Sequence, residues 1–90
     1  MPEVRFTYAL KRLFPDLEKS NFDGNTVAEV VKDIENKYPG LPDYIVEENG
    51  ALRQHVNIFV NNKMVKDRKA LSDLISEDDE IYVMQALSGG

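Results

Sequence analysis

The fold of this chain is decided by the stretch Thr26–Gly40, which reads TVAEVVKDIENKYPG. Thr26 and Glu29 have the spacing of a capping box, in which a hydroxyl and a carboxylate accept hydrogen bonds from the free amides of the first helical turn. The apolar residues of the stretch recur every three or four positions and share one helical face: Val27, Val30, Val31, Ile34 and Tyr38. Pro39 and Gly40 end the helix. Because this helix has one apolar face, it has to pack against another element.

Outside the helix, apolar and polar residues alternate, which is the pattern of half-buried strands. The alternation predicts strands at Val4–Tyr8, Val56–Val60 and Glu80–Met84, and shorter ones at Lys19–Phe22 and Met64–Val65. Asn61 and Asn62 tolerate positive φ and predict a tight hairpin turn. A hairpin, one crossing helix and three more strands give an α+β domain of the β-grasp type, with a mixed four- to five-stranded sheet. The expected core is Val4, Phe6, Val27, Val30, Ile34, Val56, Ile58, Ile81 and Val83.

The segments between these elements are expected to be loops with two short helical turns. Pro15 disfavours a regular element in the connection after the first strand. One helical turn is predicted after Pro42 and another at Ala70–Ile75, where it would close the core. The acidic run Glu77–Glu80 is predicted to be a solvated turn, because it lacks the ligand spacing and the glycine of a calcium loop.

The length, charge and composition of the chain exclude several classes of protein function. Ninety residues suit one domain, and 42% apolar with 30% charged residues is typical of a globular one. A formal charge of −5 offers no basic face for nucleic acid, and no apolar run is long enough to cross a membrane. The chain has no cysteine, and its one histidine, His55, has no partner for metal binding or nucleophilic catalysis. We therefore expect no metal site and, by default, a cytoplasmic location.

The strand pattern also predicts a patch on the sheet face away from the helix. If Ile58, Ile81 and Val83 face the helix, their neighbours Phe59, Tyr82 and Met84 face outward, beside Arg5 and Thr7 of the first strand. The residues predicted to bind a partner protein are Phe59, Tyr82, Met84 and Arg5. The alternative is that the long connection 40–53 folds over these side chains and makes them part of the core.

A family resemblance rests on several motifs together. Gly24-x-Thr26 opens the helix, VNIFVN (56–61) forms a strand, Asp78-Asp79-Glu80-Ile81 precedes the last strand, and that strand leads into Gly89-Gly90. The whole chain resembles the ubiquitin-like sulfur carriers, which include the small subunit of molybdopterin synthase, the thiamin-pathway carrier and carriers for cysteine synthesis. The stretch LRQHVNIFVNNKMV (52–65) looks most like the cysteine-synthesis branch. Members often have a proline before the tail, where this chain has Gln85.

The resemblance implies a division into a β-grasp domain, 1–85, and a flexible tail, 86–90. In the family, an activating enzyme uses ATP to adenylate the C-terminal carboxylate, here that of Gly90. A sulfur donor then converts it into a thiocarboxylate, which a sulfur-accepting synthase consumes. Glycines without a Cβ let the backbone approach a nucleotide closely. The tail residues that would deliver Gly90 are Ala86, Leu87, Ser88 and Gly89.

On this reading the chain is a protein substrate and not an enzyme, or it is the small subunit of a two-component synthase. It binds no cofactor itself, since ATP belongs to the activating partner. One alternative is a ubiquitin-like modifier whose Gly90 is joined to lysines of other proteins. Another is a plain interaction module with an idle tail. Cysteine, molybdopterin and thiamin synthesis all remain open as destinations of the sulfur.

Overall fold

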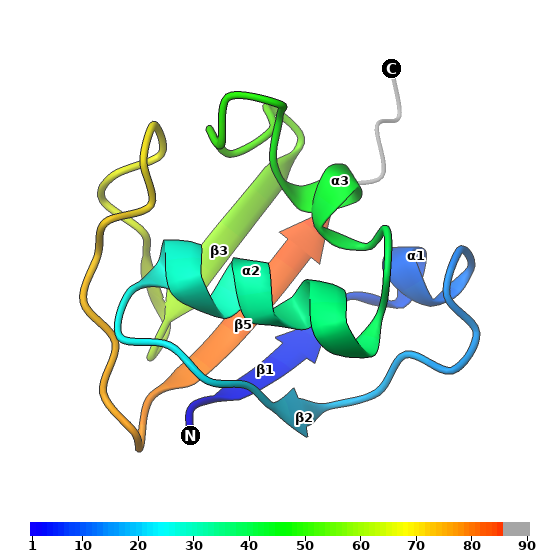
Figure 1. Cartoon of the computed structure of the whole chain (residues 1–90), viewed down its shortest axis with the longest axis horizontal. Coiled ribbons are helices and arrows are strands. Elements are labelled where there is room, and N and C mark those ends of the chain that lie inside the picture. Colours follow the sequence, from blue (N-terminus) through cyan, green and yellow to red (C-terminus); the bar gives the residue numbers. More distant parts are fainter. Residues whose placement is uncertain (86–90) are drawn as a thin grey trace.

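The computed structural model describes residues 1–85, which form one mixed sheet with a helix across one face (Figure 1). The strands are β1 (Glu3–Phe6), β2 (Ser20–Asn21), β3 (Val56–Val60), β4 (Lys63–Met64) and β5 (Glu80–Gln85). The helices are α1 (Tyr8–Lys11), α2 (Val27–Lys37) and α3 (Pro42–Ile45). The five strands have the order β2-β1-β5-β3-β4. Only β1 and β5 are parallel in this sheet, so the predicted mixed β-grasp sheet is confirmed.

Helix α2 crosses one face of the sheet, and its start follows the sequence signals closely. The Thr26 hydroxyl accepts a hydrogen bond from the Glu29 amide at 3.2 Å, as in a capping box. The Glu29 carboxylate accepts from the Asn25 amide at 2.8 Å, just before the helix and not within its first turn. Gly24 lies so close to the helix that a Cβ there would be 2.7 Å from the Val30 nitrogen. The loop into α2 therefore requires glycine at this position.

The core lies between α2 and the sheet. Every residue of the predicted core is buried, and Ile34 at the centre of α2 is fully buried. Phe22, Leu41 and Ile45 add to it from the loop before α2, the segment after it and α3. The predicted phase of the helix is thereby confirmed.

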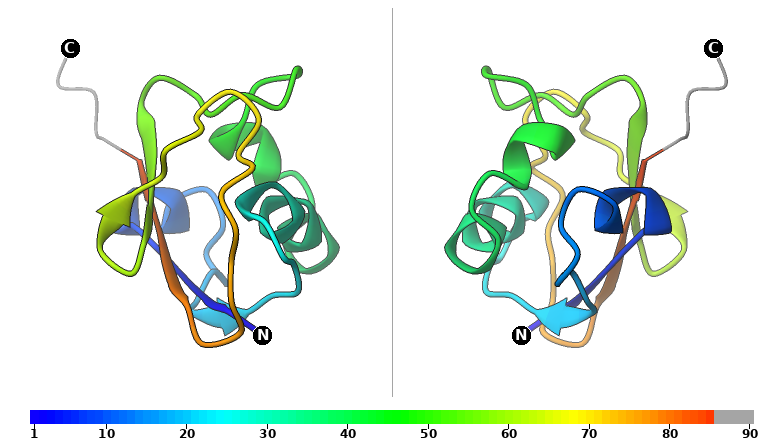
Figure 2. Two further views of the ribbon diagram at one scale, coloured as in Figure 1. Left: turned by 90° about the vertical axis from the view of Figure 1, so that its left-hand side faces the viewer. Right: turned by 90° about the vertical axis from the view of Figure 1, so that its right-hand side faces the viewer.

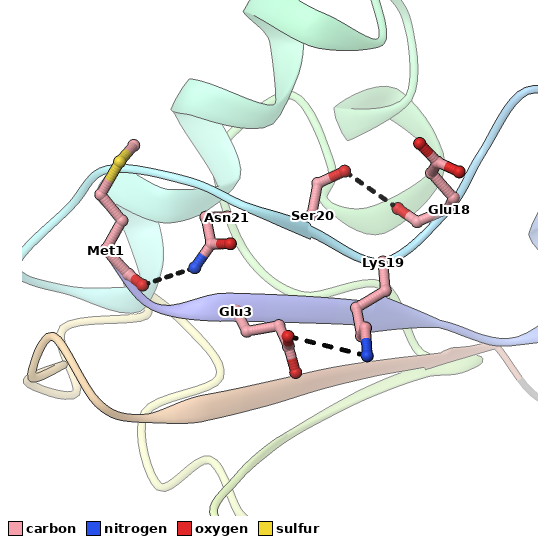
Figure 3. Close-up of polar contacts among 6 residues, drawn as sticks. All are labelled: Met1, Glu3, Glu18, Lys19, Ser20 and Asn21. Atoms are coloured by element: carbon pink, nitrogen blue, oxygen red, sulfur yellow. Dashed lines mark hydrogen bonds and ion pairs between the residues drawn. The ribbon is translucent and has the colours of Figure 1, made fainter.

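β2 has only two residues, so it makes few main-chain hydrogen bonds to β1. Polar side-chain contacts add to these bonds (Figure 3). The Asn21 side-chain amide donates to the Met1 carbonyl at 2.8 Å. Lys19 and Glu3 form an ion pair at 3.8 Å across the strand edge. Ion pairs this exposed contribute little, on the order of 0–1 kcal/mol. The sheet edge is thus fixed by several weak contacts.

Two expectations about the first connection are wrong. The first strand was predicted to reach Tyr8, but β1 ends at Phe6 and the Tyr8 side chain is 78% exposed. The connection was predicted to be a loop, but it contains α1, whose Leu10 is fully buried. The cause is tertiary: turning the chain after Phe6 buries Leu10, and Pro15 lies beyond the end of this helix.

The predicted helical turn at Ala70–Ile75 is also wrong. The Asp67 carboxylate accepts hydrogen bonds from the amides of Lys69, Ala70 and Ser72 and from the Ser72 hydroxyl. These bonds cap a single turn, in which the Leu71 amide donates to the Asp67 carbonyl at 2.9 Å. Leu71 then has a positive φ of 52°, so no right-handed helix continues through it. Further on, the chain runs beside the start of α2, where the Val27 amide donates to the Asp73 carbonyl at 3.0 Å. Ile75 is buried as expected, whereas Leu74 is 82% exposed.

Candidate functional site: the open sheet face and the end of β5

The sheet face opposite α2 carries one row of side chains across four strands. The backbone register places Arg5 of β1 beside Tyr82 of β5, Tyr82 beside Phe59 of β3, and Phe59 beside Met64 of β4. Residues directly opposite one another in neighbouring strands point to the same face. Tyr82 is 36% exposed and Met64 is 53% exposed, while Phe59 between them is half-buried. We call these four residues the cross-sheet row.

A second, shorter row lies nearer the end of β5. Met84 stands opposite Asn57 of β3, and both are half-buried. The segment 40–53, which includes α3, lies with α2 on the other side of the sheet (Figure 2). The alternative that this segment folds over the predicted patch is therefore wrong. The structure brings Arg5, Phe59, Tyr82 and Met84 onto one face, and their role in partner binding stays a prediction.

Arg5 gives the cross-sheet row a positive end. Its guanidinium carbon lies 5.9 Å from the centre of the Tyr82 ring, which is a cation–π distance. Arg5, Tyr82 and Phe59 also line an open hollow of about 450 Å³ that extends to Asn61 and Glu80. The Asn61 side chain donates to Asp79 at 2.8 Å and accepts from the Glu80 amide at 2.9 Å. These bonds fix the far end of the hollow.

The end of β5 is the second part of the site. Gln85 is its last residue and the last described one, so Ala86, Leu87, Ser88, Gly89 and Gly90 lie outside the described residues. Gln85 stands opposite Val56 of β3, and its amide donates to the Thr7 hydroxyl at 3.2 Å. The acidic run Glu77–Glu80 lies at the other end of β5. Gln85 is thus held between two neighbouring segments, far along the strand from the acidic turn.

Within residues 1–85, no group of three potential ligands is placed to hold a metal ion. His55 is exposed and lies just before β3. No helix in the described part of the chain combines the length and apolar character that a membrane span requires.

Sequence reasoning missed Met64 and Asn57. Met64 was assigned to a strand but not to the patch. The signal for it is the Asn61-Asn62 pair: both residues have positive φ, at 50° and 70°, as a two-residue hairpin turn needs. Such a turn pairs Val60 with Lys63 and Phe59 with Met64, which is the observed register. Asn57 follows from the same alternation that predicted Phe59.

Together these features define a class of protein. A β-grasp domain with one crossing helix, an open sheet face and a central last strand that leads toward Gly-Gly is a ubiquitin-like domain. The model of the ThiS family matches residues 4–90, and the chain belongs to this family of ubiquitin-like sulfur carriers. The resemblance inferred from the sequence is therefore confirmed.

Individual relatives agree with this assignment. The chain is 30% identical over 69 residues to "Sulfur carrier protein CysO" of Mycobacterium tuberculosis (strain ATCC 25618 / H37Rv), a match that covers 74% of each chain. It is 28% identical over 68 residues to "Small archaeal modifier protein 3" of Haloferax volcanii, covering 76% of this chain and 73% of that one. The expected likeness to the cysteine-synthesis branch is thus supported by a relative named sulfur carrier protein CysO.

Solved structures show the same fold. A chain in the crystal structure of the Amycolatopsis orientalis BexX/CysO complex superposes with a TM-score of 0.86 at 23% identity, covering 100% of both chains. Mycobacterium tuberculosis CysO superposes with a TM-score of 0.83 at 24% identity, covering 97% of this chain and 100% of that one. These structures support the β-grasp assignment.

Proposed function

We propose that this chain carries sulfur on Gly90. The Gly90 carboxylate attacks the α-phosphate of ATP in an activating enzyme, and pyrophosphate leaves. Sulfide from a sulfur donor then attacks the acyl carbon and displaces AMP, which leaves a thiocarboxylate. The chain supplies the acyl group, and the activating enzyme supplies the ATP site. The observation that carries the proposal is the position of β5, between β1 and β3 at the centre of the sheet, with only Ala86, Leu87 and Ser88 between its end and Gly89-Gly90 in the sequence.

Gly89 and Gly90 suit this chemistry because they lack a Cβ. A main-chain carboxylate that has to reach the α-phosphate must pass through a narrow channel, and glycine allows the closest backbone approach. Residues Ala86–Ser88 form the rest of the arm. Five residues extend at most about 17 Å, enough to reach from a domain surface into a partner's active site.

The cross-sheet row, together with Met84, is the proposed docking surface for the activating enzyme. Exposed aromatic and methionine side chains are over-represented in protein interfaces, and a flat row of them can be covered by an apolar partner surface. Arg5 at one end of the row favours a partner carboxylate there. The acidic turn Glu77–Glu80 would speed association with a basic partner surface.

The proposed destination of the sulfur is cysteine synthesis, which the sulfur-accepting synthase would complete. The support is the relative named CysO at 30% identity.

A role as the small subunit of a two-component synthase requires the thiocarboxylate to enter the active site of that synthase directly. Both versions need the same arm and the same activation step. Because ATP is the activating partner's substrate, the chain itself needs no cofactor in this proposal. The proposed location of the protein is the cytoplasm.

A second function is favoured by a specific observation. One relative is named a small archaeal modifier protein, at 28% identity. In a modifier, a lysine amine of a target protein attacks the activated Gly90 carbonyl and forms an isopeptide bond. Both functions begin with adenylation of Gly90, so they differ only in the acceptor.

Intact-mass analysis separates the two. The chain is incubated with ATP, sulfide and the activating enzyme from the same organism, and a parallel sample omits ATP. The sulfur-carrier proposal predicts an ATP-dependent mass increase equal to the exchange of one oxygen for one sulfur. A branched lysine on other proteins, found by peptide mass spectrometry of cells and without a thiocarboxylate form, would support the modifier function instead. An unchanged mass with no branched lysines would contradict both.

A further inference from the structure

Thr7 is a helix-capping residue that does not cap its helix. It occupies the N-cap position of α1 with extended backbone angles, φ −68° and ψ 156°, yet its side chain makes no cap hydrogen bond. A threonine at this position normally accepts a bond from an amide in the first helical turn. Thr26 does so at the start of α2. The Thr7 hydroxyl accepts a hydrogen bond from the Gln85 amide at 3.2 Å instead.

The sheet geometry explains this partner. The Thr7 amide donates to the Val83 carbonyl at 3.1 Å, which continues the parallel ladder between β1 and β5. In a regular ladder the next bond would join the Gln85 amide to the Thr7 carbonyl. That carbonyl already accepts a bond from the Leu10 amide at 3.1 Å, because α1 begins there. The hydroxyl therefore takes the place of the main-chain acceptor and holds the last residue of β5.

The other side of Gln85 is fixed as well. Its register partner is Val56, the first residue of β3. The Arg68 guanidinium donates to the Val56 carbonyl at 3.1 Å and to the Asn57 side chain at 2.8 Å. These bonds hold the start of β3 from the loop after β4. Gln85 thus lies between β3, which Arg68 stabilises, and Thr7.

We propose that the Thr7 hydroxyl is a positioning group that fixes Gln85, the residue before the segment 86–90, and that adenylation of Gly90 depends on it. The inference rests on the proposed function. A short arm delivers its carboxylate efficiently only if its starting point is held, because a freely moving start lowers the local concentration of the reacting group in the nucleotide site. Thr7 is not one of the four residues of the cross-sheet row, and Thr7→Val keeps the size and shape of its side chain. Loss of the hydroxyl therefore lowers kcat and leaves KM nearly unchanged.

The test compares Thr7→Val, which keeps the branched shape and removes the acceptor, with Thr7→Ser, which keeps the hydroxyl. ATP–pyrophosphate exchange is measured with the activating enzyme from the same organism at several carrier concentrations. Thr7→Val is expected to lower kcat about fivefold, the effect of losing one ordinary hydrogen bond, with KM within about twofold. Thr7→Ser is expected to restore most of the rate.

Thr26→Val is the matched control. It removes the hydroxyl that caps α2, so it lowers the stability of the fold without touching the end of β5. At a temperature where every variant is folded, its kcat is expected to equal that of the unmodified chain. An unchanged kcat in Thr7→Val, an equal loss in Thr7→Ser, or an equal loss in Thr26→Val would overturn the inference.

Amide hydrogen exchange of Gln85 in the free chain provides a readout that is independent of activity. Thr7→Val is expected to speed this exchange, while the amide of Val83 keeps its rate. An unchanged Gln85 rate would show that the hydroxyl does not hold this residue. If the unmodified chain is not adenylated at all, the proposed function fails and the role of Thr7 in adenylation fails with it, but the exchange rates still report whether the Thr7–Gln85 bond exists.

Discussion

Phe59 of β3 lies directly opposite Tyr82 of β5, on the sheet face that α2 leaves open. Met64 stands on the other side of Phe59, and Arg5 stands on the other side of Tyr82. The pair therefore forms the middle of a row that crosses four strands. Its central position makes it the part of the surface that a flat partner would cover most completely.

If this row docks the activating enzyme, Phe59→Ala or Tyr82→Ala should weaken binding by more than about 1 kcal/mol, because aromatic side chains at an interface centre dominate its energy. Isothermal titration calorimetry with the activating enzyme measures the affinity, and thermal unfolding checks that the fold is intact. The matched control is Tyr44→Ala: Tyr44 is 41% exposed and belongs to α3, which lies on the other side of the sheet from the row. Unchanged affinity in both aromatic variants would remove the row from the docking surface.

Gly24→Ala should destabilise the fold by about 1–3 kcal/mol, the usual cost of forcing an extra methyl group into a packed site. Its Cβ would be 2.7 Å from the Val30 nitrogen and 2.9 Å from the Val30 Cγ2, so the loop or α2 has to move. Gly50→Ala is the control for backbone strain, because Gly24 and Gly50 both have positive φ, at 155° and 89°, but a Cβ at Gly50 meets nothing within 4 Å. Urea denaturation measures both. A loss no greater than that of Gly50→Ala would show that the close approach to α2 costs nothing.

The parts of the fold that could be predicted from sequence are those set by local patterns. The spacing from Val27 to Tyr38 and the cap at Thr26 are sufficient to define α2, and alternation defines β3 and β5. The errors have two causes. Nothing near Tyr8 signals that the chain turns after Phe6 to bury Leu10, which is a tertiary effect. The apolar spacing at 70–75 does not signal that Leu71 adopts a positive φ of 52°, which stops a helix there.

The site divides in the same way. Alternation predicted that Phe59 and Tyr82 face outward, because it depends only on neighbouring residues. The bond between Thr7 and Gln85 could not be predicted, because it depends on where β1 ends and α1 begins relative to β5. The chemistry at Gly90 was inferred from the family resemblance. Residues 86–90, which would carry it out, lie outside the described part of the chain.

The loop after β4 should respond to acid. Hydrogen bonds from the Ser72 hydroxyl and the Ala70 amide lower the pKa of Asp67 from 3.8 to about 2. A lowered pKa means that the charged carboxylate stabilises the fold fully above about pH 4, and that this contribution is lost as the pH falls through about 2. In NMR titrations, the amides of Lys69, Ala70 and Ser72 should shift together with a midpoint near pH 2. In Asp67→Asn these shared shifts should disappear. A midpoint near 4 in the unmodified chain would mean that the carboxylate does not hold these amides.

A β-branched residue next to the reacting group should block activation without disturbing the fold. Gly89→Val places a side chain where the backbone has to approach a nucleotide closely. We expect ATP–pyrophosphate exchange to fall strongly while the thermal unfolding midpoint stays the same. Ser88→Ala is the control, since it keeps a small side chain one position earlier. Exchange at the unmodified rate in Gly89→Val would show that the arm does not enter a narrow channel.

The most direct test of the central claim is ATP–pyrophosphate exchange by a chain that lacks Gly90. If the Gly90 carboxylate is the adenylated group, deleting this residue moves the carboxylate back by one residue, and exchange should fall to background. The thermal unfolding midpoint should not change, because the deletion leaves the core and the sheet of residues 1–85 intact. Exchange at the rate of the unmodified chain would contradict the account, since the activated group would then lie elsewhere.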